Sequence, residues 1–223
     1  MERIKIIDFG ISPYRDEWDR QRKFQQIIID RKKEKFPITE EYILIGEHFP
    51  VYTLGFHGDS ANMLLKDDEM HSRGYELIRI ERGGDITYHG PGQLILYPVI
   101  DLESHSLGVK KYINLLEEAV ILLLKDYGIK GERIEGATGV WIGKGSENER
   151  KICAIGVKIS RGVTMHGLAL NVNTDLKAFS YINPCGFVNK GVTSMKEELK
   201  CEINLSNIKK KIIEIFLNMI DHD

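Results

Sequence analysis

The stretch RGGDITYHGPGQLILYP at residues 82–98 is the part of the sequence that decides how the rest of the chain is arranged. Four glycines, one proline and one histidine fall within residues 83–92, and glycine costs backbone entropy inside a regular helix or strand. Strand-like segments flank it at residues 76–80 and 93–100. We therefore predict a glycine-rich turn between two strands. It is either an ordinary hairpin or a turn that presents free N–H groups to a ligand.

Two polar side chains stand at the ends of this turn. Arg82 opens it and His89 closes it, so that a cation and a titratable ring can meet over it. Pro98, in the second strand, predicts an edge position or a bulge, because proline has no N–H to donate to a strand ladder.

The composition indicates a globular protein of the cytoplasm. The chain has 223 residues, 42% of them hydrophobic and 29% charged, enough for one sizeable α/β domain or two small ones. The net charge of −2 gives no excess of positive charge of the kind that attracts nucleic acid. The longest aliphatic run, residues 119–124, is too short to cross a bilayer, and the N-terminus lacks the apolar core of a signal peptide. We expect a cytoplasmic protein that binds neither nucleic acid nor a membrane.

Hydrophobic periodicity predicts an α+β fold. Strands are expected at residues 3–8, 42–46, 51–54, 140–143, 151–159 and 163–172, and helices at residues 13–35, 109–127 and 206–219. The first helix has an imperfect apolar face of Trp18, Phe24, Ile27 and Ile28. Residues 55–65 are polar and contain glycine, which predicts a loop. Because strands cluster in hairpins and no linker interrupts the pattern, we expect one domain over residues 1–223.

The cysteines are the first candidates for chemistry. Cys153, Cys185 and Cys201 are odd in number and lack metal-like spacing, which argues against a disulfide framework or a zinc site. The ordinary interpretation of such a cysteine is a small buried hydrophobe. Cys185 differs because it lies in a Pro-Cys-Gly turn, which can present the sulfur at a surface. An ordinary thiol is only a few per cent thiolate at neutral pH, so a nucleophilic Cys185 needs a base or a nearby cation.

The candidate bases are His57, His89, His166 and a lysine. Lys151 begins a strand whose following residues are apolar, and a lysine amine desolvated in such surroundings can serve as a general base. The alternative interpretation of Lys151 is a solvated lysine at the end of a strand. His166 lies in an apolar strand and is more typical of a core histidine than of a catalytic one.

Three segments together resemble the lipoyl(octanoyl) transferase family. They are RGGDITYHGPGQLILYP at residues 82–98, KICAIGVKISRGVTMHGLALNVNTDL at residues 151–176 and INPCG at residues 182–186. FPVYTLG at residues 49–55 and GVTS at residues 191–194 are similar to that family as well. The resemblance covers roughly residues 49–194, and several long motifs in the same order make it specific.

The resemblance implies a fold and an activity. The fold is a mixed sheet flanked by helices, as in the catalytic domains of biotin ligases and lipoate ligases. The family moves an octanoyl group from octanoyl-acyl carrier protein to a lysine on the lipoyl domains of 2-oxoacid dehydrogenases or on the H protein of the glycine cleavage system. This is the first step of endogenous lipoate synthesis, and the resemblance implies no metal, no nucleotide and no other cofactor.

The resemblance also implies a set of site residues. The family's acyl-thioester cysteine corresponds to Cys185, and the lysine paired with it corresponds to Lys151. Its acyl-binding segments map onto Arg82, Gly83, Gly84, Asp85, Ile86, Thr87, Tyr88 and His89, onto Ala154, Ile155 and Gly156, and onto Gly167, Leu168 and Ala169. We expect Lys151 to take the thiol proton and later that of the acceptor amine, in a ping-pong reaction that needs no ATP. On this interpretation Cys153 and Cys201 are structural.

Three alternatives stay open from the sequence. A lipoate–protein ligase on the same fold would adenylate a free acid and would need no cysteine, so the placement of Cys185 argues against it. An amidotransferase between lipoyl domains would keep Cys185 and change only the donor. A non-catalytic acyl-binding or lipoyl-domain-binding protein would tolerate the loss of both Cys185 and Lys151.

Overall fold

A large mixed β-sheet forms the centre of the molecule. The structure, a computed structural model, describes residues 3–183 and 191–221. The main path of the sheet runs in the order β1 (Ile4–Ser12), β2 (Glu41–His48), β6 (Gln93–Val99), β10 (Val163–Asn171), β9 (Arg150–Ser160), β8 (Ala137–Ile142) and β7 (Glu132–Ile134). The short strand β11 (Gly191–Val192) also pairs with β9. Because β1–β2 and β9–β11 are parallel and the other pairs antiparallel, the predicted α+β class with a mixed sheet is confirmed.

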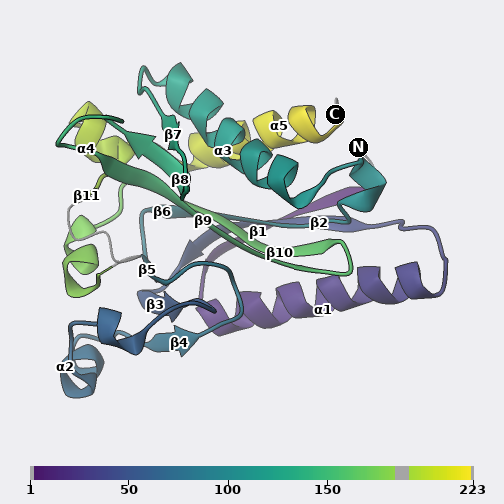
Figure 1. Ribbon diagram of the computed structural model, residues 1–223, viewed down its shortest axis with the longest axis horizontal. Coiled ribbons are helices and arrows are strands. Elements are labelled where there is room, and N and C mark those ends of the chain that lie inside the picture. The colour runs from purple at the N-terminus through teal and green to yellow at the C-terminus, as the bar shows by residue number, and fades with distance from the viewer. Residues whose placement is uncertain (1–2, 184–190, 222–223) are drawn as a thin grey trace.

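Helices cover both faces of this sheet (Figure 1). α1 (Tyr14–Lys33) lies on one face, and α3 (Val109–Asp126) and α5 (Leu205–Asp221) lie together on the other. Two shorter helices, α2 (Asp67–Ser72) and α4 (Met195–Leu199), lie at the periphery. The long helices match their predicted ranges, and Gly128, with φ of +72°, ends α3 as the sequence predicts. No helix of the described residues is long and apolar enough to cross a membrane.

The glycine-rich stretch differs from its prediction. It contains a strand of its own, β5 (Ile86–His89), which pairs with β3 (Val51–Leu54), and β3 pairs in turn with β4 (Leu77–Arg79) in a separate three-stranded sheet. β4 and β6 therefore belong to different sheets, and the hairpin interpretation is wrong. The residues at positions 80–85 instead carry the chain from β4 to β5.

Pro98 is not at an edge, because β6 lies between β2 and β10. The paired residues of β6 and β10 end at Leu96 opposite Leu168. Beyond that point β10 contains His166, whose φ of +61° is left-handed and irregular for a strand. The missing N–H of Pro98 thus falls where β10 departs from regular geometry.

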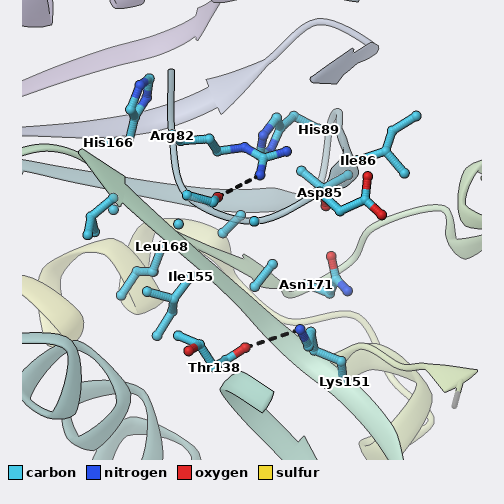
Figure 2. Close-up of a pocket in the computed structure, with 18 of the residues that line it drawn as sticks. Arg82, Asp85, Ile86, His89, Thr138, Lys151, Ile155, His166, Leu168 and Asn171 are labelled. Carbon is cyan, nitrogen blue, oxygen red and sulfur yellow. Dashed lines mark hydrogen bonds between the residues drawn. The ribbon is translucent and has the colours of Figure 1, made fainter. Parts of the chain in front are cut away.

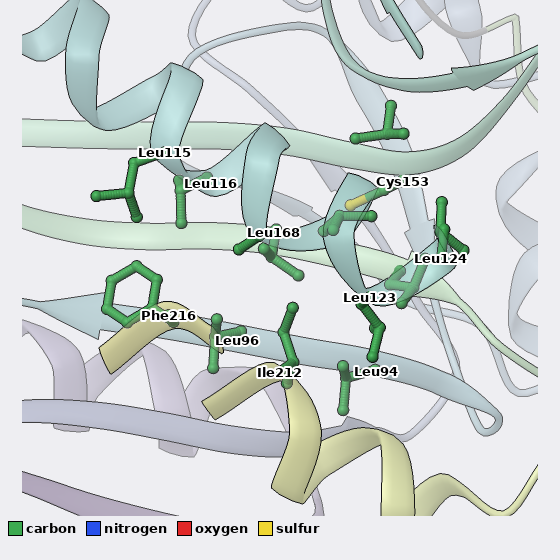
Figure 3. Packing of buried hydrophobic residues seen from close by; sticks show 14 of the residues in the cluster. Leu94, Leu96, Leu115, Leu116, Leu123, Leu124, Cys153, Leu168, Ile212 and Phe216 are labelled. Carbon is green, nitrogen blue, oxygen red and sulfur yellow. The ribbon is translucent and has the colours of Figure 1, made fainter. Parts of the chain in front are cut away.

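The main core lies between the sheet and the helix pair α3–α5 (Figure 3). Leu116, Leu123 and Leu124 from α3 and Ile212 and Phe216 from α5 are fully buried there. They pack on side chains from the central strands, Leu94, Leu96, Cys153 and Leu168 among them. This closely packed layer supports the central strands, which also line the site described below.

The face of α1 that packs on the sheet differs from the predicted face in one residue, because it includes Ile29 in place of Ile27. Ile29 is buried, whereas Ile27 is 37% exposed. Two glutamines share the buried face: the Gln25 amide donates to the Val163 carbonyl at 2.9 Å, and Gln21 accepts from the His166 N–H at 2.7 Å. α1 is therefore docked partly by hydrogen bonds to the irregular part of β10, which hydrophobic periodicity does not reveal.

Truncation of the main core should destabilise the protein strongly. Leu123→Ala removes a fully buried side chain, and we expect it to lower the free energy of unfolding by about 2–5 kcal/mol. Val109→Ala, at a position 54% exposed on the same helix, should change it by less than about 0.5 kcal/mol. Urea unfolding followed by circular dichroism measures both, and equal effects of the two variants would contradict the packing described.

Candidate active site

A cavity of about 510 Å³ lies between the large sheet and the residues that lead into β5 (Figure 2). The sheet side carries small residues, Ala154 and Gly156 on β9 and Gly167 and Ala169 on β10. Residues 83–87 form the other wall, and the Gly83 N–H donates to the Val157 carbonyl of β9 at 3.0 Å. The glycine-rich segment is thus attached directly to the sheet beside the cavity.

Two glycines allow this close approach. A Cβ on Gly156 would lie 2.8 Å from the Gly83 carbonyl oxygen, which is too short for a carbon–oxygen contact. A Cβ on Gly167 would overlap the Leu96 carbonyl oxygen of the neighbouring strand. Both positions therefore need glycine for steric reasons alone, because any side chain would push apart the segments that line the cavity.

Most of the predicted site residues surround this one cavity, although three separate segments of the chain supply them. The predicted lining residues are Arg82, Gly83, Gly84, Asp85, Ile86, Thr87 and His89, then Lys151, Ala154, Ile155 and Gly156, and then Gly167, Leu168 and Ala169. Tyr88 is the exception: it packs away from the cavity, with its ring centroid 5.2 Å from that of Tyr52 and 5.6 Å from that of Phe179. Cys185 lies outside the described residues.

Lys151 lies on the side of the cavity opposite Arg82 and His89 (Figure 2). Its Nζ atom donates to the Thr138 carbonyl at 3.1 Å and lies 4.7 Å from the centroid of the Trp141 ring. Both contacts come from β8, which pairs with β9 at this point. The amine is therefore directed by a carbonyl and an aromatic face toward the cavity rather than left as a mobile chain in solvent.

The Arg82 side chain is buried and donates to β3. Its Nη2 atom donates to the Thr53 carbonyl at 2.7 Å and to the Thr53 hydroxyl at 3.0 Å. A guanidinium can only donate, so the hydroxyl of Thr53 is free to donate its own proton to His89 Nε2, at 3.4 Å. Arg82 and His89, which were predicted to meet over the turn, are connected through Thr53, to which each of them is hydrogen-bonded.

The same chain of hydrogen bonds continues from His89 to the far end of the cavity. His89 Nδ1 donates to Gln93 Oε1 at 2.8 Å, and the Gln93 amide donates to Asn171 Oδ1 at 2.9 Å. The Asn171 amide then donates to the Thr193 carbonyl at 3.0 Å. The donor and acceptor directions are consistent along this whole series of hydrogen bonds. It begins at the Arg82 guanidinium, which can only donate, and ends at the Thr193 carbonyl, which can only accept.

Residues 14–217 match the family model of the lipoyl protein ligase A/B catalytic domain. The chain belongs to this family. An octanoyltransferase of Bacteroides thetaiotaomicron is 51% identical over 207 residues, which are 93% of this chain and 91% of that protein. The family predicted from the motifs is confirmed, and so is the prediction that the chain is an enzyme of the acyltransferase class.

Solved structures of ligases share the fold of this family. A chain from the structure of a bipartite lipoate protein ligase and its E2 lipoyl domain, from Thermoplasma acidophilum, has a TM-score of 0.70 at 19% identity. The match covers 99% of this chain and 84% of that one. The biotin protein ligase of Aquifex aeolicus has a TM-score of 0.52 at 10% identity, over 99% of this chain and 70% of that one. The predicted likeness of the fold to lipoate and biotin ligases is confirmed.

Several lining residues of this lipoyl ligase-family site were not predicted. Tyr14, Gln93, Tyr97, Thr138, Trp141 and Asn171 all line the cavity. Gln93, Tyr97 and Asn171 lie inside the motifs, so the motifs identified the right segments but not which side chains turn inward. Tyr14 and Trp141 lie outside the motifs, and nothing in their local sequence signals a site.

Cys153 lies two residues from Lys151 but belongs to the core of the family fold. It is fully buried against α3, and burial raises the pKa of its thiol well above the ordinary value. The prediction of a small buried residue is confirmed. Cys201 is exposed, so the prediction that it is a structural cysteine is wrong.

Within the described part of the chain, no group of three or more His, Cys, Asp or Glu side chains could hold a metal ion.

Three buried histidines should make the stability of the protein fall in mild acid. Burial lowers the pKa of His48 to about 4 and that of His166 to about 3, and it places the pKa of His89 well below its ordinary value. The unfolded chain takes up these protons near pH 6.5, where the native state does not. The free energy of unfolding should therefore fall as pH drops below about 6.5, by up to about 1.4 kcal/mol per pH unit for each histidine, until the native pKa is reached.

Urea unfolding between pH 7.5 and pH 5 measures this slope. His48→Gln should reduce it, and the same substitution at His71, which is exposed on α2, is the matched control. A slope that is the same in the wild type and in His48→Gln would contradict the uncharged native state of His48.

Proposed function

We propose that the chain transfers an octanoyl group from octanoyl-acyl carrier protein to the lysine amine of lipoyl domains, through a thioester on Cys185. The observation that carries this proposal is the pairing of β11 with β9, in which Val192 is the register partner of Lys151. β11 begins six residues after Cys185 (191 − 185). The segment that follows Cys185 in the sequence is therefore paired with the strand that carries Lys151.

The other end of the cysteine turn supports the same placement. Phe179, before the turn, lines the cavity, as do Gly191 and Val192 after it. The Thr193 N–H donates to the Lys151 carbonyl at 3.0 Å, which fixes the segment after the turn against β9. Residues before and after positions 184–190 thus line the cavity that Lys151 enters, which supports the proposed cysteine–lysine pair.

The proposed reaction has two halves with Lys151 as the proton carrier. Lys151 takes the Cys185 proton, the thiolate attacks the acyl carrier thioester, and the carrier thiol leaves with the proton. The amine of the acceptor lysine then attacks the new thioester at Cys185, passing its proton through Lys151 to the sulfur that leaves. The thioester of the acyl carrier becomes a thioester on Cys185 and then an amide on the acceptor lysine, so no ATP is consumed. The acceptors we propose are lipoyl domains of 2-oxoacid dehydrogenases and the H protein.

The cavity provides the binding site for the acyl chain on this proposal. Its walls of glycine, alanine, isoleucine and leucine offer apolar surface between the segments predicted to bind acyl groups. Burial contributes about 0.8 kcal/mol per methylene, so an eight-carbon chain gains several kcal/mol. The same segments come from across residues 82–192, so we propose that the whole chain acts as one catalytic unit.

Cys185 should carry the octanoyl group after incubation with octanoyl-acyl carrier protein. Intact-mass spectrometry should detect one octanoyl adduct on the wild type and none on Cys185→Ser, because a hydroxyl is a much weaker nucleophile than a thiolate. Cys201→Ser, at an exposed cysteine away from the cavity, should be acylated like the wild type. Full transfer activity in Cys185→Ser would overturn the mechanism.

A comparison of donors separates the amidotransferase and ligase alternatives. Octanoylated lipoyl protein tests the amidotransferase, and free octanoate with ATP tests the ligase, each in place of the carrier thioester.

Lys151 should be required as a base and not only as a cation. Lys151→Ala should lower kcat by about 10²–10⁴-fold, the usual contribution of a positioned general base. Lys151→Arg keeps the positive charge but cannot release a proton near neutral pH, so it should fail to the same degree. Transfer assays at pH 7.5 measure both variants, with circular dichroism as the folding control. Wild-type kcat in Lys151→Arg would exclude proton transfer through this residue.

A further inference from the structure

The loop between β3 and α2, residues 55–65, is attached to the cavity wall. The Phe56 N–H donates to the Arg82 carbonyl at 2.9 Å, and the His57 N–H donates to the Gly84 carbonyl at 3.3 Å. The first half of this loop therefore follows the glycine-rich segment residue by residue. A loop predicted only as a polar connection is hydrogen-bonded to the wall of the site.

The second half of the same loop pairs with the residues that lead into the cysteine turn. Met63 and Ile182 form an antiparallel bridge, and the Leu64 N–H donates to the Tyr181 carbonyl at 2.9 Å. The Asn183 N–H donates to the Asn62 carbonyl at 2.9 Å. Met63 and Ile182 also pack in the hydrophobic cluster that contains Ile86 of β5. Asn183 precedes Cys185 by two positions, so this pairing fixes the described residues that lead to the cysteine.

Asn62 connects the two halves through its own side chain. It lies in the short 3₁₀-helix η1 (Ser60–Asn62), and its Nδ2 atom donates to Asp85 Oδ2 at 2.6 Å. Asp85 lies in the cavity wall and is labelled in Figure 2. One residue thus holds the cavity wall through its amide and the approach to the cysteine turn through its carbonyl.

We infer that Asn62 is a positioning residue that holds residues 181–183, which lead to Cys185, in place relative to the acyl-binding wall. This inference rests on the proposed function, because it assumes that Cys185 is the nucleophile. A nucleophile must lie within a few tenths of an ångström of its productive position, and a displacement of about 1 Å can cost about a hundredfold in rate. The carboxylate–amide bond between Asp85 and Asn62 is charge-assisted, so it is strong and directional enough to hold the loop.

The polarity of this bond provides a specific test. Asn62→Asp would put two carboxylates against each other and should repel the loop from the wall. Asp85→Asn alone leaves an amide that can still accept from Asn62. In the double variant Asn62→Asp with Asp85→Asn, the donor and acceptor exchange places and the bond can form again.

The experiment measures the single-turnover rate of Cys185 acylation by octanoyl-acyl carrier protein, using rapid quench and intact-mass spectrometry. We expect Asn62→Asp to slow acylation by about tenfold to a hundredfold. The double variant should recover most of that loss relative to Asn62→Asp. Ser60→Ala, at an exposed position on the same 3₁₀-helix, is the matched control and should acylate like the wild type.

Each outcome separates this inference from the proposed function. If the wild type forms no adduct on Cys185, the proposed function fails and the inference fails with it. If the wild type is acylated, wild-type acylation by Asn62→Asp overturns the inference alone. A double variant no faster than Asn62→Asp overturns it as well, because a loss that the exchange does not repair does not act through this bond. Thermal unfolding of each variant identifies any loss that comes from global destabilisation.

Discussion

The structure depends most on the buried guanidinium of Arg82. A charged group taken out of water is costly unless hydrogen bonds replace its hydration, and Thr53 of β3 accepts three hydrogen bonds from the guanidinium. The next residue, Gly83, donates its N–H to Val157 of β9. Arg82 and Gly83 therefore join the small sheet to the large sheet at the wall of the cavity.

The buried charge also determines the character of the polar groups around it. Burial is the main cause of the low pKa of His89 and of His166, and the positive charge of Arg82 lowers both further. Two histidines close to a fixed cation remain neutral, and neutral rings can each donate and accept one hydrogen bond. His89 uses both, accepting from Thr53 and donating to Gln93, so its ring has a defined orientation within the hydrogen-bond chain.

The cavity has two different sides as a result. On the Arg82 side, donors and acceptors are matched along a hydrogen-bond chain that ends at the Thr193 carbonyl. The Lys151 side is built on β8 and β9, and its amine is oriented by one carbonyl and one aromatic ring. Small residues between the two sides leave space for an acyl chain. The hydrogen-bonded frame and the loop that contains Asn62 connect these sides to the segment that carries Cys185.

The sequence by itself determined the segments, and the tertiary structure decided how they are joined. The hydrophobic periodicity of a helix and the glycine that ends it are local properties, so the long helices and the β9–β10 pair were predicted correctly. Family motifs also marked the segments that line the cavity. Which sheet a strand enters depends on contacts distant in the chain, so β5 and the central position of Pro98 were missed. Tyr88 was assigned to the site because a motif runs continuously along the chain. Tyr88 instead packs against Tyr52 and Phe179 in a separate hydrophobic cluster, whereas its neighbour His89 lines the cavity.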